Sequence, residues 1–422
     1  MPYFIYAVVL ALFILPKINI IGVEGFNAGL RIDDALILLM ASLIFSTKMI
    51  NRKAPPLSLF EKKFFIFLLV ITAGTLINSL GYNRGTILFP IRFAEYFIFF
   101  YLGRIFFSVG YSLKSMMTVV FAVNVTIALL QYAHVIGGFT VRGYTPDVSE
   151  RVVGITSGPW ELGVLLNFIC CYFLVNEKSS LKKYAILIIA TAVILLNGSR
   201  MSLVAQAAIT LAYFISASSI TSILKKSFFL IPALIVAIAV FDGSGVSSRS
   251  ESLASWDNIE SLTSSYSNVQ LKDEIPTWDE LGVLKGGDLD TSWSMRGIKW
   301  IYAIKLFLSS PLFILFGVGS GAFGNALDGG WLRILTEWGI IGSATFVAFF
   351  LLIKNLNATM RLMTIAFAVN MLMIDIYMSY KVMSFIIFCA GYFYKKQTKY
   401  ATNNPSNLSN HSPSRTPTLK KQ

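Results

Sequence analysis

Arginines that border or interrupt apolar stretches are the residues of this chain best suited to chemistry. The set consists of Arg84, Arg92, Arg142, Arg151, Arg200, Arg296 and Arg333. A guanidinium beside or within a membrane span is costly unless it serves a purpose, and its planar fork of donors matches the oxygens of a diphosphate. Arg200 is the clearest case, because LLNGSRMSL places it between two apolar runs with almost no loop around it.

Ion pairing inside a helical bundle is the alternative role for these arginines. Glu95 follows Arg92 closely, and Glu150 and Glu161 lie near Arg151 in the sequence. For one isolated arginine, nothing in the sequence separates the two roles. A set that converges on one face of the protein favours phosphate binding, because bidentate donors suit a diphosphate.

Carboxylates near these arginines could take a proton from an attacking hydroxyl group. The candidates are Glu161, Asp328 and Glu337. Asp328 comes first because it lies just before a predicted membrane span, although an aspartate before a Gly-Gly pair also suits a turn. The isolated tryptophans of the same region, such as Trp293, suit anchoring in the lipid headgroup region or stacking on the face of a sugar.

The run GSGAFG, from Gly319 to Gly324, matches the pattern G-x-G-x-x-G of dinucleotide-binding proteins. That pattern requires a preceding strand and a following helix in a soluble βαβ unit, and this context is absent from the sequence here. We therefore exclude a nucleotide site. The prediction that remains is a tight backbone turn, which lets the chain approach another helix or a ligand closely.

Composition defines the class of protein that must position these residues. Hydrophobic residues make up 55% of the 422 residues, charged residues 14%, and the mean hydropathy is +0.67, whereas about a quarter of the residues of a soluble domain are charged. The chain is thus predicted to be a polytopic membrane protein. Its net charge of +13 does not indicate nucleic-acid binding, because Lys and Arg are scattered between apolar segments. The cysteines lie in apolar stretches without metal-ligand spacing, so no metal is expected.

With roughly 20 apolar residues per span, the sequence predicts an all-α integral membrane fold of about twelve transmembrane helices. Residues 1–241 hold helices 1 to 9, residues 242–330 form a large loop, residues 331–394 hold helices 10 to 12, and residues 395–422 form a polar, disordered tail. From Trp293 the loop has the spacing of an amphipathic helix at the membrane interface. The predicted spans are Tyr3 to Ile20, Asp34 to Ser46, Phe64 to Leu80, Ile91 to Phe107, Ser115 to Ile136, Pro159 to Val175, Tyr184 to Asn197, Met201 to Ser218, Ser227 to Phe241, Trp331 to Leu352, Leu362 to Tyr377 and Lys381 to Tyr394.

Lysine and arginine gather in alternate loops, which predicts the orientation because these residues resist translocation across the membrane. The cytoplasmic set of loops then carries Lys48, Arg52, Lys53, Lys62, Lys63, Lys114, Lys178, Lys182, Lys183, Lys225, Lys226, Lys354, Arg361, Lys395, Lys396 and Lys399. Both termini are thus predicted to be cytoplasmic. The large loop, with most of the acids, is predicted to face outward into the periplasm.

Several segments resemble, in this order, the bacterial O-antigen polymerase and O-antigen ligase superfamily. They are RVVGITSGPWELG (Arg151 to Gly163), LNGSR (Leu196 to Arg200), the Arg296 segment leading to FGVGSGAFG, and LRILTEWGIIG (Leu332 to Gly342). The likeness spans about Arg84 to Leu352. It is carried by the order of these segments, by the side of the membrane on which they fall, and by the loop between them.

The resemblance implies a glycosyltransferase of the GT-C type in the bacterial inner membrane, with no nucleotide sugar and no other cofactor. Its partners would be a donor and an acceptor oligosaccharide linked to undecaprenyl diphosphate, the lipid bilayer, a chain-length regulator and a flippase. The resemblance also implies that outward arginines hold the diphosphate, which assigns this role to Arg200 and Arg296, and then to Arg151 and Arg142. The remaining candidates for substrate binding are Arg92, Arg333 and Trp293.

One position separates the members of this superfamily. Ligases carry a histidine shortly before the span that follows the large loop, whereas this chain has Asp328 and a Gly-Gly pair there, and its histidines are His134 and His411. This difference favours an O-antigen polymerase, with a ligase or an exopolysaccharide polymerase as the alternative enzymes. A lipid-linked oligosaccharide flippase is the non-enzyme alternative. A flippase should show two similar halves, and the sequence shows no internal repeat.

Overall fold

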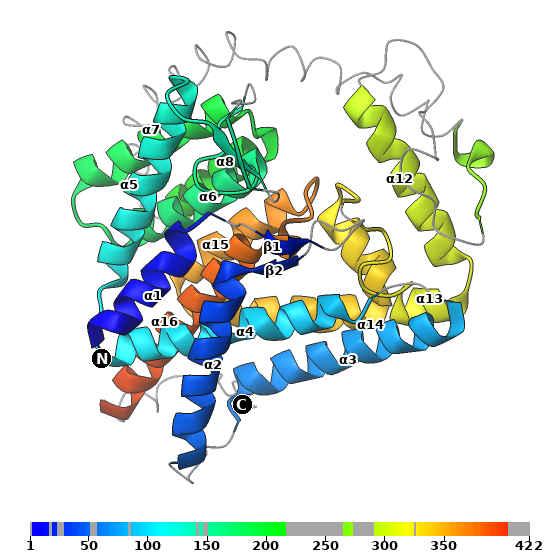
Figure 1. Cartoon of the computed structure of the whole chain (residues 1–422), viewed down its shortest axis with the longest axis horizontal. Helices are drawn as coiled ribbons and strands as arrows, with labels where there is room; N and C mark the ends of the chain where they lie inside the picture. Colours follow the sequence, from blue (N-terminus) through cyan, green and yellow to red (C-terminus); the bar gives the residue numbers. More distant parts are fainter. Residues whose placement is uncertain are drawn as a thin grey trace, which may run out of the picture.

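The protein is mostly helical, in line with the predicted all-α class (Figure 1). The computed structural model describes residues 2–16, 19–22, 29–50, 57–82, 86–140, 143–146, 151–216, 265–272, 291–324 and 326–403. Within these residues, four helices are long and apolar enough to cross a membrane: α5 (Leu113–Tyr132), α6 (Pro159–Asn176), α7 (Ser180–Asn197) and α14 (Gly330–Lys354). These helices support the prediction of a membrane protein, whereas the total of about twelve spans stays a prediction.

Further helices and two hairpins complete the described part. The helices are α1 (Pro2–Ile14), α2 (Ile32–Ile50), α3 (Leu59–Tyr82), α4 (Leu88–Ser108), α8 (Arg200–Ile215), α12 (Thr291–Leu308), α13 (Pro311–Phe316), α15 (Ala358–Asn370) and α16 (Tyr380–Asn403). The antiparallel hairpins pair β1 (Asn19–Gly22) with β2 (Gly29–Arg31), and β3 (Gly138–Thr140) with β4 (Gly143–Thr145). In Figure 1, α5 to α8 lie on one side of the molecule and α12 and α13 on the other.

The C-terminal part differs from the predicted spans. The sequence predicts one span over 362–377, but α15 ends at Asn370, and residues 371–379 form turns and the short 3₁₀ helix η2 (Ile376–Met378) before α16 begins. The physical reason is Asp375, whose carboxylate accepts hydrogen bonds from the amides of Leu327 and Gly329 and from Arg333 of α14. The predicted tail also begins too early, because α16 continues to Asn403. The predicted span 227–241, residues 242–264, 273–290 and 325 of the loop, and residues 404–422 lie outside the described residues.

Local signals build the turn between α7 and α8, which carries Arg200. Gly198 ends α7 in the left-handed conformation at φ 65°, which glycine adopts without strain. The side chain of Asn197 accepts a hydrogen bond from the amide of Ser199 (2.8 Å) and donates one to the carbonyl of Pro159 (3.1 Å) at the start of α6. The turn is thereby fixed against α6, and Arg200 becomes the first residue of α8.

Helices α4 and α16 pack closely because glycines lie in their contact. A Cβ atom at Gly103 would lie 2.0 Å from the carbonyl oxygen of Phe388, and one at Gly391 would lie 2.0 Å from that of Phe100. Small residues of this kind let two helix backbones approach each other. Aromatic side chains of α3, α4 and α14 pack beside this contact, among them Phe64, Phe67, Phe93, Phe97, Trp338 and Phe346.

Helix α14 is broken at Gly339, whose φ of 67° and ψ of −175° are not helical. Near the break, the carbonyls of Thr336 and Glu337 accept hydrogen bonds from the amides of Val318 (2.9 Å) and Gly319 (3.1 Å). Non-helical backbone at membrane depth is tolerated where protein covers it. The glycine run therefore approaches another helix closely, which is one of the two roles predicted for it.

Ion pairs between neighbouring helices gather basic side chains at one end of the bundle. Lys114, at the start of α5, lies 2.6 Å from Glu177, just after the end of α6. Arg104, near the end of α4, lies 3.4 Å from Glu61 in the first turn of α3. The hydrogen bond from Lys114 lowers the pKa of Glu177 to about 2. The candidate site residues lie near the opposite ends of these helices, and the side of the membrane that each end faces stays a prediction.

Replacing Gly339 by alanine is expected to destabilise the protein by about 3 kcal/mol, because a Cβ at this left-handed position would lie 2.3 Å from the carbonyl oxygen of Leu315. Gly110→Ala is the matched control. Its φ is 90° with nothing within 4 Å of the Cβ, so we expect a cost of only about 1 kcal/mol. Thermal unfolding of the purified protein measures both variants, and equal losses would contradict the close packing at the break.

Candidate functional site

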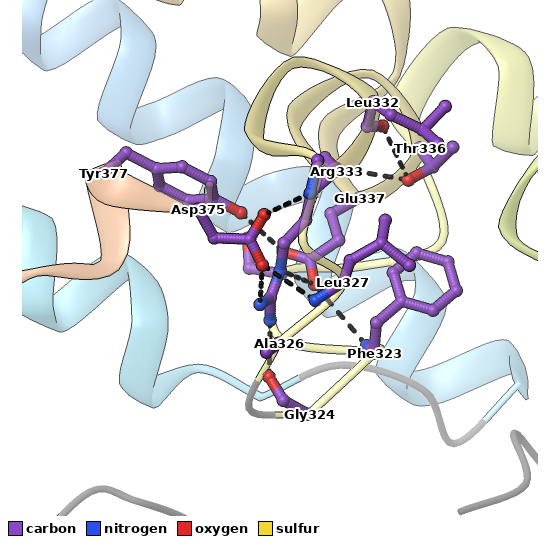
Figure 2. Close-up of polar contacts among 12 residues, drawn as sticks. Phe323, Gly324, Ala326, Leu327, Leu332, Arg333, Thr336, Glu337, Asp375 and Tyr377 are labelled. Atoms are coloured by element: carbon purple, nitrogen blue, oxygen red, sulfur yellow. Dashed lines mark hydrogen bonds and ion pairs between the residues drawn. The ribbon is translucent and has the colours of Figure 1, made fainter. Parts of the chain in front are cut away.

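A fully buried arginine, Arg333, lies at the centre of the candidate site (Figure 2). Its Nε donates to Oε1 of Glu337 at 2.9 Å, its Nη1 to Oδ2 of Asp375 at 2.9 Å, and its Nη2 to the carbonyl of Gly324 at 2.5 Å. Arg333 and Glu337 are one helical turn apart in α14, so they share a face. Both were candidates from the sequence, and the structure pairs them with each other.

Asp375 is the residue that the sequence analysis missed. Besides Arg333, its carboxylate accepts hydrogen bonds from the amides of Leu327 (2.8 Å), Asp328 (3.3 Å) and Gly329 (3.1 Å). It lies in the turns between α15 and α16, which we call segment 371–379. One signal could have revealed it, because Asp375 is an acid within the apolar run MLMIDIYM, and an ionisable residue there marks a special position.

Side chains of segment 371–379 also donate hydrogen bonds to Glu337 and Glu161, two of the carboxylates predicted from the sequence. Tyr377 donates to Oε2 of Glu337 at 3.3 Å, and the hydroxyl of Ser379 donates to Glu161. Glu161 accepts two further hydrogen bonds from Ser157, one from its amide and one from its hydroxyl, both at 2.8 Å. Glu161 and Glu337 are therefore both buried acceptors in one hydrogen-bonded core.

Arg296 and Asp328 form the partly exposed edge of this core. Nε of Arg296 lies 3.5 Å from Oδ2 of Asp328, and the two side chains are 29% and 36% exposed. Asp328 has a left-handed backbone with φ 58°, which aspartate tolerates better than most residues. The turn predicted before the Gly-Gly pair is therefore present, and it presents the Asp328 side chain toward α12.

Helix α12 contacts this turn through side chains on one face. Nζ of Lys299 donates to the carbonyl of Ala326 at 3.3 Å, and Nε1 of Trp300 donates to that of Leu327 at 3.1 Å. Burial lowers the pKa of Lys299, and the charge of Asp328 opposes this shift. Because Lys299 and Trp300 follow Arg296 by three and four residues, each lies on the face of the helix that carries Arg296.

Arg151 and Arg200 lie at the turn between α7 and α8. Nε and Nη2 of Arg151 donate to the carbonyls of Asn197 (2.8 Å) and Gly198 (3.0 Å). An arginine that binds the last carbonyls of a helix also neutralises the negative end of its dipole. Arg151 therefore caps α7. The hydroxyl of Ser202, in the first turn of α8, donates to the side chain of Asn370 at 3.2 Å, which connects α8 to the last residue of α15, just before segment 371–379.

Arg92 has the partner that the ion-pairing alternative names, Glu95, and a second one, Asp34. Its Nη1 lies 2.6 Å from Glu95 and 3.3 Å from Asp34. Its helix still reaches the site, because the hydroxyl of Tyr96 donates to the carbonyl of Met378 at 3.3 Å. Arg84, Arg142 and the side chain of Trp293 lie outside what the structure describes.

The structure therefore brings together five of the predicted residues around segment 371–379, namely Glu161, Arg296, Asp328, Arg333 and Glu337. Burial then separates their roles. Glu161 is 2% exposed and Glu337 is 1% exposed, so neither reaches a ligand without rearrangement. Asp328 is the carboxylate among the three that a substrate can reach. Within the described ranges, no group of His, Cys, Asp and Glu is suited to hold a metal ion.

No protein-family model matches this chain, and a search of curated proteins finds no match.

Removing the buried guanidinium is expected to destabilise the fold strongly. Arg333→Met leaves Glu337 and Asp375 buried without their cation, which costs about 3 to 5 kcal/mol. The control is Arg92→Met, whose side chain is 25% exposed and also pairs with two carboxylates, and which should cost no more than about 1 kcal/mol. Denaturant unfolding of the purified variants measures the difference. A small loss for Arg333→Met would show that the cluster is not a structural centre.

Proposed function

We propose that this protein polymerises the repeat units of a surface polysaccharide on the outer face of the bacterial inner membrane, using oligosaccharides linked to undecaprenyl diphosphate. One observation carries the proposal. Residues from separate segments of the O-antigen polymerase resemblance, Glu161 of α6 and Arg333 and Glu337 of α14, contact one segment of nine residues, 371–379. The exposed pair of Arg296 and Asp328 lies beside it.

The chemistry of the proposed reaction assigns a role to Arg296 and a different role to Asp328. The oxygen of an acceptor hydroxyl attacks the anomeric carbon of the donor sugar, and the bond from that carbon to the diphosphate oxygen breaks. The leaving diphosphate keeps the electron pair, and preorganised arginine donors stabilise the charge that develops on it. We assign this role to Arg296 and Arg200. The carboxylate of Asp328 accepts the hydroxyl proton as general base.

A polymerase fits better than a ligase because Asp328 stands where ligases of the resembling superfamily have histidine. A flippase remains the second candidate, and specific observations favour it. The broken helix α14 and the buried charges of Arg333, Glu337 and Asp375 are features that transporters also use. Opposing this candidate, Arg296 and Asp328 meet at an exposed edge, which suits a site at a membrane surface.

A strain that lacks this protein is expected to attach single repeat units to its acceptor and to make no polysaccharide ladder on a gel. A ligase would instead leave long polymer on the carrier lipid with none attached. Loss of a flippase would leave lipid-linked repeat units on the cytoplasmic side of the membrane. Glycosidases added to the outside of spheroplasts cannot reach these units. An unchanged ladder would refute the polymerase proposal and both alternatives.

A lysine in place of Arg200 or Arg296, the two arginines proposed to bind the diphosphate, keeps the positive charge but loses the fork of parallel donors. Arg200→Lys and Arg296→Lys are therefore expected to lower polymerisation of purified lipid-linked repeat units about a hundredfold, nearly as much as the alanine variants do. Arg361→Lys is the matched control, because Arg361 is exposed at the start of α15, away from segment 371–379, and it should retain full activity. If lysine restores most activity at both positions, these arginines do not clamp a diphosphate.

A further inference from the structure

Asp375 ties the turn that carries Asp328 to the start of α14. Its carboxylate accepts from three successive amides, those of Leu327, Asp328 and Gly329, at 2.8, 3.3 and 3.1 Å. It also accepts from Nη1 of Arg333 at 2.9 Å. Consecutive amides that point at one anion form a small concave site, in which the anion fixes the path of the backbone.

The turn needs this support because its backbone is unfavourable. Asp328 has φ 58°, and a residue other than glycine keeps such a conformation only where its surroundings determine it. Helix α12 also contacts the turn, through the 3.5 Å approach of Arg296 to the Asp328 carboxylate and the neutral hydrogen bond of 3.1 Å from Trp300 to the carbonyl of Leu327. The stronger, charge-assisted hydrogen bonds to the turn come from Asp375.

Asp375 itself is unsuited to proton transfer. Its Oδ2 accepts from the amides of Leu327 and Asp328 and from Arg333, and its Oδ1 accepts from the amide of Gly329. The residue is 6% exposed, so an acceptor hydroxyl cannot reach it. Its effect on chemistry must therefore pass through the turn.

We infer that Asp375 is a positioning residue, which holds the turn 327–329 so that the Asp328 carboxylate faces Arg296 at the exposed edge. The inference rests on the proposed function only for the role of Asp328 as base. The hold on the turn is a separate physical claim, and it can be measured without any activity.

The first experiment measures the turn directly. Asp328→Cys is introduced into the full chain, whose native cysteines are buried, and is labelled with a membrane-impermeant maleimide. Adding Asp375→Asn is expected to change the labelling rate about tenfold, because the amide cannot accept from all the donors of the charged carboxylate. The matched control adds Glu61→Gln, another buried carboxylate with backbone and arginine donors, at the opposite end of the bundle. A rate that Asp375→Asn leaves within about twofold would overturn the inference.

The second experiment separates positioning from general stability. Asp375→Asn is expected to lower kcat of polymerisation about tenfold, with little change in KM. In the Asp328→Asn background, the same substitution should cost nothing more, because its effect passes through Asp328. A purely structural role would instead lower the amount of active enzyme equally in both backgrounds, and losses that multiply would overturn the inference. Glu61→Gln should leave kcat unchanged.

Asp375→Glu serves if the asparagine variant does not reach the membrane. It keeps a negative charge for Arg333, but its longer side chain cannot place the carboxylate among the three amides, so it should show the same change in labelling and kcat. Lack of polymerising activity in the parent protein would refute the proposed function. The labelling rates would then still decide whether Asp375 holds the turn.

Discussion

The burial of Arg333 is the constraint on which the rest of this structure depends. A guanidinium with no exposed surface loses several kcal/mol of hydration, which only well-placed partners offset. Those partners come from separate parts of the chain: Glu337 in α14, Asp375 in segment 371–379, and the carbonyl of Gly324 in the glycine run. Two carboxylates for one cation leave an excess of negative charge, which the amides of the turn 327–329 help to satisfy. One buried charge thereby organises several turns.

The break in α14 follows from the same arrangement. Glu337 must face Arg333, and two residues later Gly339 leaves the helical conformation, where the glycine run packs against the exposed backbone. Gly317 has φ 77° and, like Gly339, has no room for a Cβ. The glycine pattern is therefore a packing device between two backbones. The likeness to a nucleotide-binding pattern carries no further meaning, because the amides of Val318 and Gly319 are used by α14 itself.

Hydropathy and local signals predict much of the helical framework, including the start of α6 at Pro159 and the end of α7 before Gly198. The spacing of Arg333 and Glu337 also predicts that they share a face. What local pattern cannot predict is segment 371–379, because an apolar turn and an apolar helix have the same composition. The difference lies in partners far along the chain, such as the contacts of Asp375 with the turn 327–329. Arg151 illustrates the same limit, since its capping of α7 joins residues distant in sequence.

The arginines then fall into two groups that sequence alone does not separate. Arg333, Arg151 and Arg92 each have short hydrogen bonds to carboxylates or helix carbonyls, so these contacts serve the fold. Among the described residues, Arg296 approaches Asp328 at the longer distance of 3.5 Å, and its side chain is 29% exposed. The diphosphate of the proposed reaction would compete there with a weak ion pair. The buried cluster behind the edge contributes rigidity, because donors that stabilise a developing charge must already be in position when the charge forms. For the proposed reaction, the buried and hydrogen-bonded core beneath Arg296 and Asp328 satisfies that condition.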